Sequence, residues 1–164
     1  MGIGGAYAGS GLQIGDLAVA SAEHDAELGV VTPDGWQGAE RIGIPVVERD
    51  GVSYFNQFPV DAALSKRVAG AVGAARGPFL SVQSCSGTAD LGARRAARVA
   101  GALCENMEGA AAAQVCLRHG GIPFVELRAI SNHVEDRDTS RWDLPGACRR
   151  AQDAARIALK ELTC

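Results

Sequence analysis

The chain has 164 residues, which is enough for one domain with a hydrophobic core, and we assign residues 1–164 to a single domain. Hydrophobic residues make up 47% and charged residues 21%, as in ordinary soluble globular proteins. A formal net charge of -3 without a basic run argues against a nucleic-acid partner, and no stretch is apolar for long enough to span a membrane. The first residues also lack the charged and apolar segments of a signal peptide, so we expect a cytoplasmic protein with no membrane partner.

Five cysteines and three histidines show no spacing that is typical of a metal site. The cysteines stand at positions 85, 104, 116, 148 and 164, and no Cys-x-x-Cys pair occurs. Their odd number does not fit a disulfide framework either. We therefore interpret them as small buried hydrophobic side chains in a reducing compartment, and we expect neither a metal nor a cofactor.

The first half of the chain contains one clear strand and one clear helix. Residues 2–15 are rich in glycine and resemble a loop, whereas residues 16–22 have the apolar character of a strand. Residues 29–60 contain three prolines and several glycines, which predicts a long irregular stretch of a kind that is often functional. Residues 61–75 are predicted to form a helix with Asp61 as its N-cap.

The next segments alternate between strand and helix. Residues 78–83 are a short apolar run that predicts a buried strand, and turn-forming residues 84–88 follow it. A helix is expected from Ala89 to about Val99. Its arginines, at positions 94, 95 and 98, have the spacing of one helix face, which we interpret as solvated.

The last part of the chain repeats this alternation. Residues 107–119 are predicted to form a helix capped by Asn106. Residues 122–130 are almost continuously apolar, which indicates a parallel strand covered on both faces. A polar loop is expected at residues 131–141, and an amphipathic helix at residues 144–162 closes the chain.

The alternation of strands and helices predicts an α/β fold with a central sheet. In such folds, ligands bind beyond the carboxyl ends of the strands. That rule singles out the loop after residue 83, the loop after residue 130 and the glycine-rich turn at residues 2–5. A shared cleft between these three places is therefore the expected site.

Glu108 begins the predicted helix at residues 107–119, ahead of a run of alanines. The helix dipole favours a carboxylate there by ~0.3–1 kcal/mol, and this structural explanation is sufficient by itself. The functional explanation is that Glu108 accepts hydrogen bonds from a diol, such as two ribose hydroxyls. Those charge-assisted bonds would strengthen as the sugar becomes cationic, so both explanations stay open.

Asn132 follows the strand predicted at residues 122–130. Taken alone, it fits a turn residue that bonds to its own backbone. The glycines at positions 2, 4 and 5 can bring backbone N–H groups close to a ligand, although glycine-rich turns are common. Ser84 and Ser86 lie outside any Gly-x-Ser-x-Gly elbow, so a serine nucleophile is not indicated.

Together, four short motifs occur in the order and spacing of the nucleoside phosphorylase/nucleosidase superfamily. They are Gly2-Ile3-Gly4-Gly5, Ile14-Gly15-Asp16, Asn106-Met107-Glu108-Gly109-Ala110-Ala111 and Leu127-Arg128-Ala129-Ile130-Ser131-Asn132. Within that superfamily the chain resembles the futalosine hydrolases, through residues 54–59, 132–138 and 140–145. The methylthioadenosine/S-adenosylhomocysteine nucleosidases are close relatives of that family. The resemblance covers essentially the whole chain.

The resemblance implies a three-layer fold in which helices flank a central mixed sheet. It implies hydrolysis of the N-ribosidic bond of futalosine in menaquinone biosynthesis, which releases hypoxanthine and dehypoxanthine futalosine. It also implies a homo-oligomer, a dimer or larger, in which a loop of the partner completes the pocket. The alternatives are a methylthioadenosine/S-adenosylhomocysteine nucleosidase, a purine nucleoside phosphorylase, and a module that binds nucleosides without turnover.

By resemblance, the motif residues take positions around a purine nucleoside. Glu108 holds the 2′ and 3′ hydroxyls and Met107 packs against the ribose, while Asn132 has the base-recognition position and Trp142 covers the nucleoside. Further substrate-binding residues are expected in three segments. Cys85 and Ser86 line the purine, Ile3, Gly4 and Gly5 border the water or anion site, and Phe58 belongs to the candidate partner loop at residues 54–58.

An asparagine at position 132 favours one class of base. Adenine carries an amino donor at C6, which suits an aspartate, whereas hypoxanthine carries an oxo acceptor, which suits the NH2 of an asparagine. A mismatched buried polar partner costs about 1–3 kcal/mol, which is enough to determine substrate choice. Asn132 therefore predicts a 6-oxopurine nucleoside, and futalosine has that base.

Members of the family begin with a strand, a loop and a helix that have no counterpart in this sequence. That part supplies the glutamate that activates water, and no residue here is matched to it. We therefore expect an N-terminally incomplete domain with an exposed sheet edge where those strands would pair.

Overall fold

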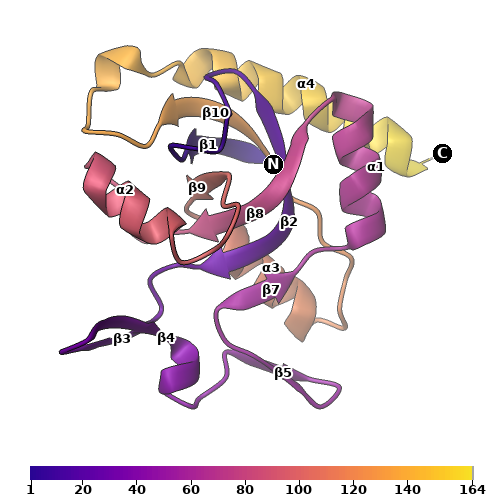
Figure 1. The fold of residues 1–164 in the computed structure, drawn as a ribbon. Coiled ribbons are helices and arrows are strands. Elements are labelled where there is room, and N and C mark those ends of the chain that lie inside the picture. Colours follow the sequence, from indigo (N-terminus) through magenta and orange to yellow (C-terminus); the bar gives the residue numbers. More distant parts are fainter. Residues whose placement is uncertain (164) are drawn as a thin grey trace.

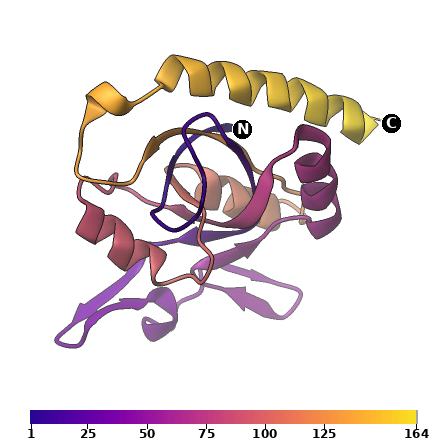
Figure 2. The same cartoon turned by 45° about the horizontal axis from the view of Figure 1, so that its top comes forward.

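The computed structural model describes residues 1–163, which form a mixed α/β domain with helices around a central sheet (Figures 1 and 2). The sheet strands are β1 (Gly2–Ala6), β2 (Leu17–Asp25), β7 (Gln57–Pro59), β8 (Ala75–Ser81), β9 (Cys104–Asn106) and β10 (Leu127–His133). The α-helices are α1 (Ala62–Val72), α2 (Ala89–Ala96), α3 (Gly109–Arg118) and α4 (Leu144–Thr163). None of the helices in these residues is long and apolar enough to cross a bilayer.

The central sheet closes on itself. Its strand order is β10-β1-β9-β8-β2-β7, and β10 also pairs with β2. The pairs β1–β10, β2–β8 and β8–β9 are parallel, whereas β1–β9, β2–β10 and β2–β7 are antiparallel. The mixed sheet expected from the resemblance is therefore present. Strand β1 has a partner on each side, so the exposed edge expected there is not found at Gly5 and Ala6.

Strand β1 corrects the prediction of a loop over residues 2–15. Gly2 to Ala6 pair with β10, and Gly5 and Ala6 also pair with β9. A Cβ atom on Gly4 would lie 2.9 Å from the Glu105 carbonyl oxygen, so this strand needs glycine to approach its neighbours. Glycine contributes nothing to a hydrophobic pattern, so the pattern of residues 2–6 does not predict a strand.

The predicted irregular stretch at residues 29–60 contains short regular elements instead. Two hairpins project from the sheet on the side away from α4 (Figure 1), and a 3-10 turn and strand β7 lie in the same stretch. These elements are β3 (Gly29–Thr32), β4 (Gly35–Gly38), η1 (Ala39–Arg41), β5 (Val47–Arg49) and β6 (Val52–Tyr54). Each is only three or four residues long, too short for a periodic pattern to reveal.

Strand β10 begins and ends later than the strand predicted at residues 122–130. Residues 122–126 are irregular, whereas Ser131, Asn132 and His133 belong to the strand. Pairing of Asn132 with Gly5 and of His133 with Ala6 extends the strand in spite of the polar side chains. Asn132 is therefore a strand residue and not a turn residue, and its side chain has a fixed direction.

The predicted helices are present, with small shifts at their ends. Asp61 caps α1 by accepting from the Leu64 N–H at 2.9 Å, and Gly73 ends that helix with a φ of 66°. Helix α2 ends at Ala96, earlier than expected. The prediction that the arginines of this helix are solvated is wrong for Arg95, which is buried and pairs with Glu27.

The interpretation of the cysteines as buried hydrophobic side chains holds for Cys104 and fails for others. Cys104 is fully buried in the sheet, whereas Cys85 and Cys148 are exposed. These cysteines and Cys116 are free thiols. The prediction for Cys164 lies outside the described residues.

Candidate active site

A cavity of about 250 Å³ lies where β1 and β10 meet the segments that follow β8 and β9. It brings together nine of the residues expected around a nucleoside: Ile3, Gly4, Gly5, Cys85, Ser86, Met107, Glu108, Asn132 and Trp142. Phe58 does not line it, because its side chain is fully buried against Ala110 and Ala113 of α3. The three predicted places therefore share one cavity, although β1 runs antiparallel to β9.

Glu108 is held at the start of α3 by bonds to the backbone around it. The Asn106 side-chain oxygen accepts from the N–H of Glu108 at 3.0 Å and from that of Gly109 at 2.7 Å. Ser81 Oγ accepts from the N–H of Ala110 at 2.7 Å. These bonds satisfy the first N–H groups of the helix, so the Glu108 carboxylate is not needed as a cap and remains free to face a ligand.

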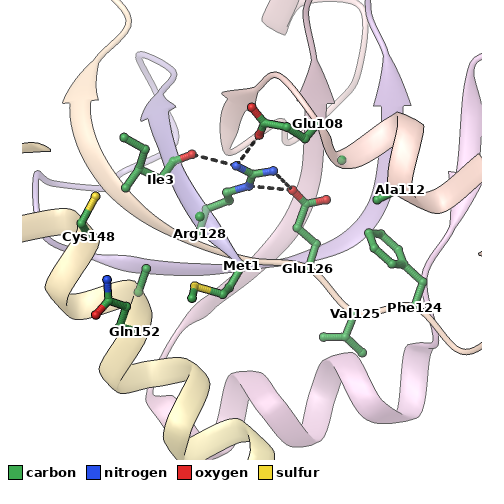
Figure 3. A pocket seen from close by; sticks show the side chains of 13 residues that line it. Met1, Ile3, Glu108, Ala112, Phe124, Val125, Glu126, Arg128, Cys148 and Gln152 are labelled. Atoms are coloured by element: carbon green, nitrogen blue, oxygen red, sulfur yellow. Dashed lines mark hydrogen bonds and ion pairs between the residues drawn. The ribbon is translucent and has the colours of Figure 1, made fainter.

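Arg128 connects Glu108 to the interior of the domain (Figure 3). Its Nη1 donates to Glu108 Oε2 at 2.8 Å and to the Ile3 carbonyl at 3.1 Å, while its Nε donates to Glu126 Oε1 at 2.7 Å. Burial alone would lower the pKa of Arg128, but Glu126 and Glu108 raise it above its ordinary value. This permanent cation fixes the direction of the Glu108 carboxylate.

The same guanidinium separates two cavities. A wider cavity, of about 510 Å³, lies beside Arg128 between α3 and α4 and shares Ile3, Glu108 and Arg128 with the smaller one. Figure 3 shows Cys148 and Gln152 of α4 on one wall of it, with Phe124 and Val125 on another. Glu108 therefore has access to both spaces.

Two buried carboxyl groups, those of Glu23 and Glu126, accept hydrogen bonds from Asn106 and Arg128 respectively. Glu23 Oε1 accepts from Ser81 Oγ at 2.6 Å and from Asn106 Nδ2 at 2.8 Å. Among the described residues, Oε2 of Glu23 and of Glu126 are buried without a protein donor, and both groups lie against Gly109. Burial, and then the charge of Glu126, raise the pKa of Glu23 well above its ordinary range. A proton that Glu23 retains can form a hydrogen bond to the Glu126 carboxylate.

This raised pKa predicts a stability that depends on pH. In acid, Glu23 is protonated in both the folded and the unfolded chain. As pH rises beyond the ordinary glutamate range, the unfolded chain loses this proton while the folded chain retains it. The free energy of unfolding therefore falls with rising pH until the folded pKa is passed.

Glu23→Gln is expected to remove this pH dependence. Its amide can accept from Ser81 and Asn106 and can donate to Glu126 Oε2, so it replaces the retained proton by a permanent bond. We expect the variant to match the original chain in free energy of unfolding near pH 4–5 and to exceed it at pH 8–9. Urea denaturation at both pH values measures this. Parallel pH profiles for the two proteins would contradict the account of the carboxyl pair.

At the other end of the cavity, the Asn132 amide has a defined orientation. Its Oδ1 accepts from Ser131 Oγ at 2.8 Å, and its Nδ2 donates to the His133 carbonyl at 3.0 Å. A carbonyl can only accept, so the nitrogen must lie on that side, and its second hydrogen remains available. Trp142 also lines this end, with the Arg137 guanidinium 4.8 Å from its ring centre. The arrangement offers a donor and an aromatic face to a flat base.

The loop after β8 is held over the cavity by buried charges. Glu105 Oε1 accepts from the Ser86 N–H at 2.9 Å, and its Oε2 accepts from Ser86 Oγ at 2.6 Å and from the Tyr7 hydroxyl at 3.2 Å. Burial, and then the charge of Glu105, raise the pKa of Tyr7 above its ordinary value, so Tyr7 stays a donor. Arg95 donates to the Ser84 carbonyl at 2.7 Å and pairs with Glu27. These contacts fix the position of Ser86 in the cavity wall.

Sequence reasoning missed several residues that line this cavity. Arg128 and Asn106 lie inside the motifs that carry the resemblance, and that position was a usable signal. Glu105 directly precedes Asn106, but no pattern distinguished it from a surface carboxylate. Arg137 lies in an exposed polar segment. No group of three or more His, Cys, Asp or Glu side chains within residues 1–163 is placed to share a metal ion.

Comparison with known families matches residues 1–163 to the phosphorylase superfamily. Among curated proteins, the chain is 36% identical over 152 residues to a futalosine hydrolase of Acidothermus cellulolyticus, covering 86% of the chain and 56% of that protein. It is 37% identical over 153 residues to that of Streptomyces coelicolor, covering 93% of the chain and 60% of the relative. It is 35% identical over 160 residues to the futalosine hydrolase of Thermus thermophilus, covering 98% of the chain and 68% of that protein. The chain thus spans about three fifths of the length of the first two relatives.

Solved structures show the same fold. The S-adenosylhomocysteine nucleosidase of Streptococcus pyogenes, in complex with 5-methylthiotubericidin, superimposes with a TM-score of 0.79 at 21% identity, covering 98% of this chain and 66% of that one. A methylthioadenosine/S-adenosylhomocysteine nucleosidase of Colwellia psychrerythraea in complex with adenine superimposes with a TM-score of 0.77 at 19% identity. The match covers 98% of this chain and 65% of that one.

Proposed function

Since the chain belongs to the phosphorylase superfamily, we propose that its smaller cavity binds a purine nucleoside and that the protein hydrolyses the N-ribosidic bond of futalosine. The single observation that carries this proposal is the placement of Glu108 and Asn132 in one cavity. The similarity to three futalosine hydrolases supports the choice of substrate.

Glu108 would act on the sugar. Its carboxylate lies at the junction of the two cavities and is directed by Arg128 at 2.8 Å. Bonds from the 2′ and 3′ hydroxyls to this carboxylate would strengthen as the sugar gains positive charge during cleavage of the C–N bond. Met107, half-exposed beside Glu108, offers an apolar surface to the ribose.

Asn132 would act on the base. As the C–N bond breaks, the purine gains negative charge, which a hydrogen-bond donor at N7 and O6 stabilises. The second hydrogen of Asn132 Nδ2 is available for this bond. Trp142 and the Cys85–Ser86 segment would enclose the faces and edge of the purine.

Incubation of the protein with futalosine, with and without inorganic phosphate, tests the proposal. We expect hypoxanthine and dehypoxanthine futalosine in both samples, measured by chromatography. Product that forms only with phosphate, as a ribose 1-phosphate, would instead indicate a phosphorylase. Tight nucleoside binding without release of base would indicate a binding module.

A further inference from the structure

We propose that Glu105 is a second base-recognition residue, whose carboxylate accepts the N1–H of a 6-oxopurine beside the Asn132 amide. This inference rests on the proposed function, and it specifies how that site selects its substrate class. Glu105 lines the same cavity as Asn132 and Trp142, and its side chain is buried. The recognition of the sugar does not involve it.

The sheet register places Glu105 and Asn132 on either side of Gly5. Gly5 pairs with Asn132 of β10 and with Glu105 of β9. A Cβ atom on Gly5 would lie 3.0 Å from Asn132 Nδ2 and 3.6 Å from Glu105 Cγ. Because Gly5 has no side chain, the amide and the carboxylate converge on the same part of the cavity.

The Glu105 carboxylate keeps capacity for one more donor. Three donors reach it, namely the Ser86 N–H, the Ser86 hydroxyl and the Tyr7 hydroxyl. A carboxylate has about four acceptor positions, so one remains. Arg95 does not occupy that position, because its Nη1 donates to Ser86 Oγ at 2.9 Å and the Ser86 hydroxyl in turn donates to Glu105. A buried carboxylate that has fixed donors on one side and a cavity on the other is a preorganised acceptor.

The pair of side chains matches the edge of hypoxanthine. That edge presents an acceptor, O6, next to a donor, N1–H, while Asn132 and Glu105 present a donor next to an acceptor. Adenine has the opposite pattern, with an amino donor at C6 and an acceptor at N1. Adenine would therefore face Asn132 and Glu105 with two mismatches, and a site that leaves buried polar groups unpaired discriminates strongly.

Glu105→Gln tests this assignment with little change in size. The single glutamine oxygen can still accept from the hydroxyls of Ser86 and Tyr7. Its NH2 takes the place of Oε1, so the bond from the Ser86 N–H is lost and the cavity meets a donor in place of an acceptor. We expect affinity for hypoxanthine, measured by calorimetry, to fall about 10- to 100-fold. Affinity for adenine should be unchanged or improved, because its N1 can accept from the glutamine. Glu27→Gln, which alters the support of the same loop from outside the cavity, should leave the ratio of the two affinities unchanged.

Binding of 1-methylhypoxanthine tests the contact without relying on one variant. The original protein should bind it much more weakly than hypoxanthine, and this difference should shrink in Glu105→Gln. A purely steric effect of the methyl group would persist in the variant, which has a side chain of similar size. Equal binding of the two bases by the original protein, or an unchanged hypoxanthine-to-adenine ratio in Glu105→Gln, would overturn the proposal.

Measuring futalosine cleavage in parallel distinguishes the role of Glu105 in base recognition from the proposed hydrolase activity. Hypoxanthine release by the original protein together with an unchanged base ratio in Glu105→Gln would refute the role of Glu105 alone. Selective hypoxanthine binding that Glu105→Gln abolishes, in a protein without turnover, would support Glu105 and refute the hydrolase. Failure to bind any purine would refute both.

Discussion

Glu108→Gln is expected to lower kcat for futalosine by about 100- to 1000-fold. The glutamine keeps the length of the side chain and can still bond to a hydroxyl. It lacks the negative charge that would strengthen both diol bonds as the sugar becomes cationic. The variant therefore loses stabilisation of the transition state more than binding of the substrate. Release of hypoxanthine under saturating futalosine measures it.

The fold should tolerate this change. The Glu108 side chain is 68% exposed, so its ion pair with Arg128 is weakened by solvent, and Arg128 retains Glu126. We expect a free energy of unfolding within about 1 kcal/mol of the original protein. Asp90→Asn, which removes an exposed partner of Arg94 and does not line the cavity, is the matched charge control and should keep full activity. A normal rate in Glu108→Gln would remove Glu108 from the mechanism.

Asn132→Asp should change the preferred base. The aspartate has the same shape, but near O6 of hypoxanthine it places a carboxylate oxygen where the amide donated. An unpaired buried polar group typically costs about 1–3 kcal/mol, so kcat/KM for futalosine should fall about 10- to 100-fold. The 6-amino analogue of futalosine offers a donor to the new carboxylate, so its relative kcat/KM should rise.

The ratio of the two substrates separates this effect from local damage. The variant also loses the bond from Asn132 Nδ2 to the His133 carbonyl, which can weaken the end of β10. Such damage lowers kcat/KM for both substrates, as Asn132→Ala would show. An unchanged ratio in Asn132→Asp would refute the role of Asn132 in base selection.

The sequence revealed the elements whose side chains follow a pattern. Helix α1 was located through the Asp61 cap and helix α4 through its amphipathic face, and β2 through its apolar run. Strands β1 and β9 escaped prediction because pairing with neighbours, and not local propensity, makes them strands. The same pairing extends β10 through Asn132.

The candidate site was predictable to the extent that motifs carry it. Glu108 and Asn132 were located by motif, and they share a cavity with the predicted glycines and with Trp142. Glu105 and Arg95 could not be found, because nothing in a sequence tells a buried charged side chain from an exposed one. Phe58 was assigned to the site, but its β-strand directs the side chain into the core against α3.

The most direct test compares kcat/KM for futalosine with kcat/KM for its 6-amino analogue in the original protein. A donor at position 132 predicts faster release of hypoxanthine than of adenine, by about 10-fold or more. Equal rates, or faster release of adenine, would contradict a site that selects oxygen at C6.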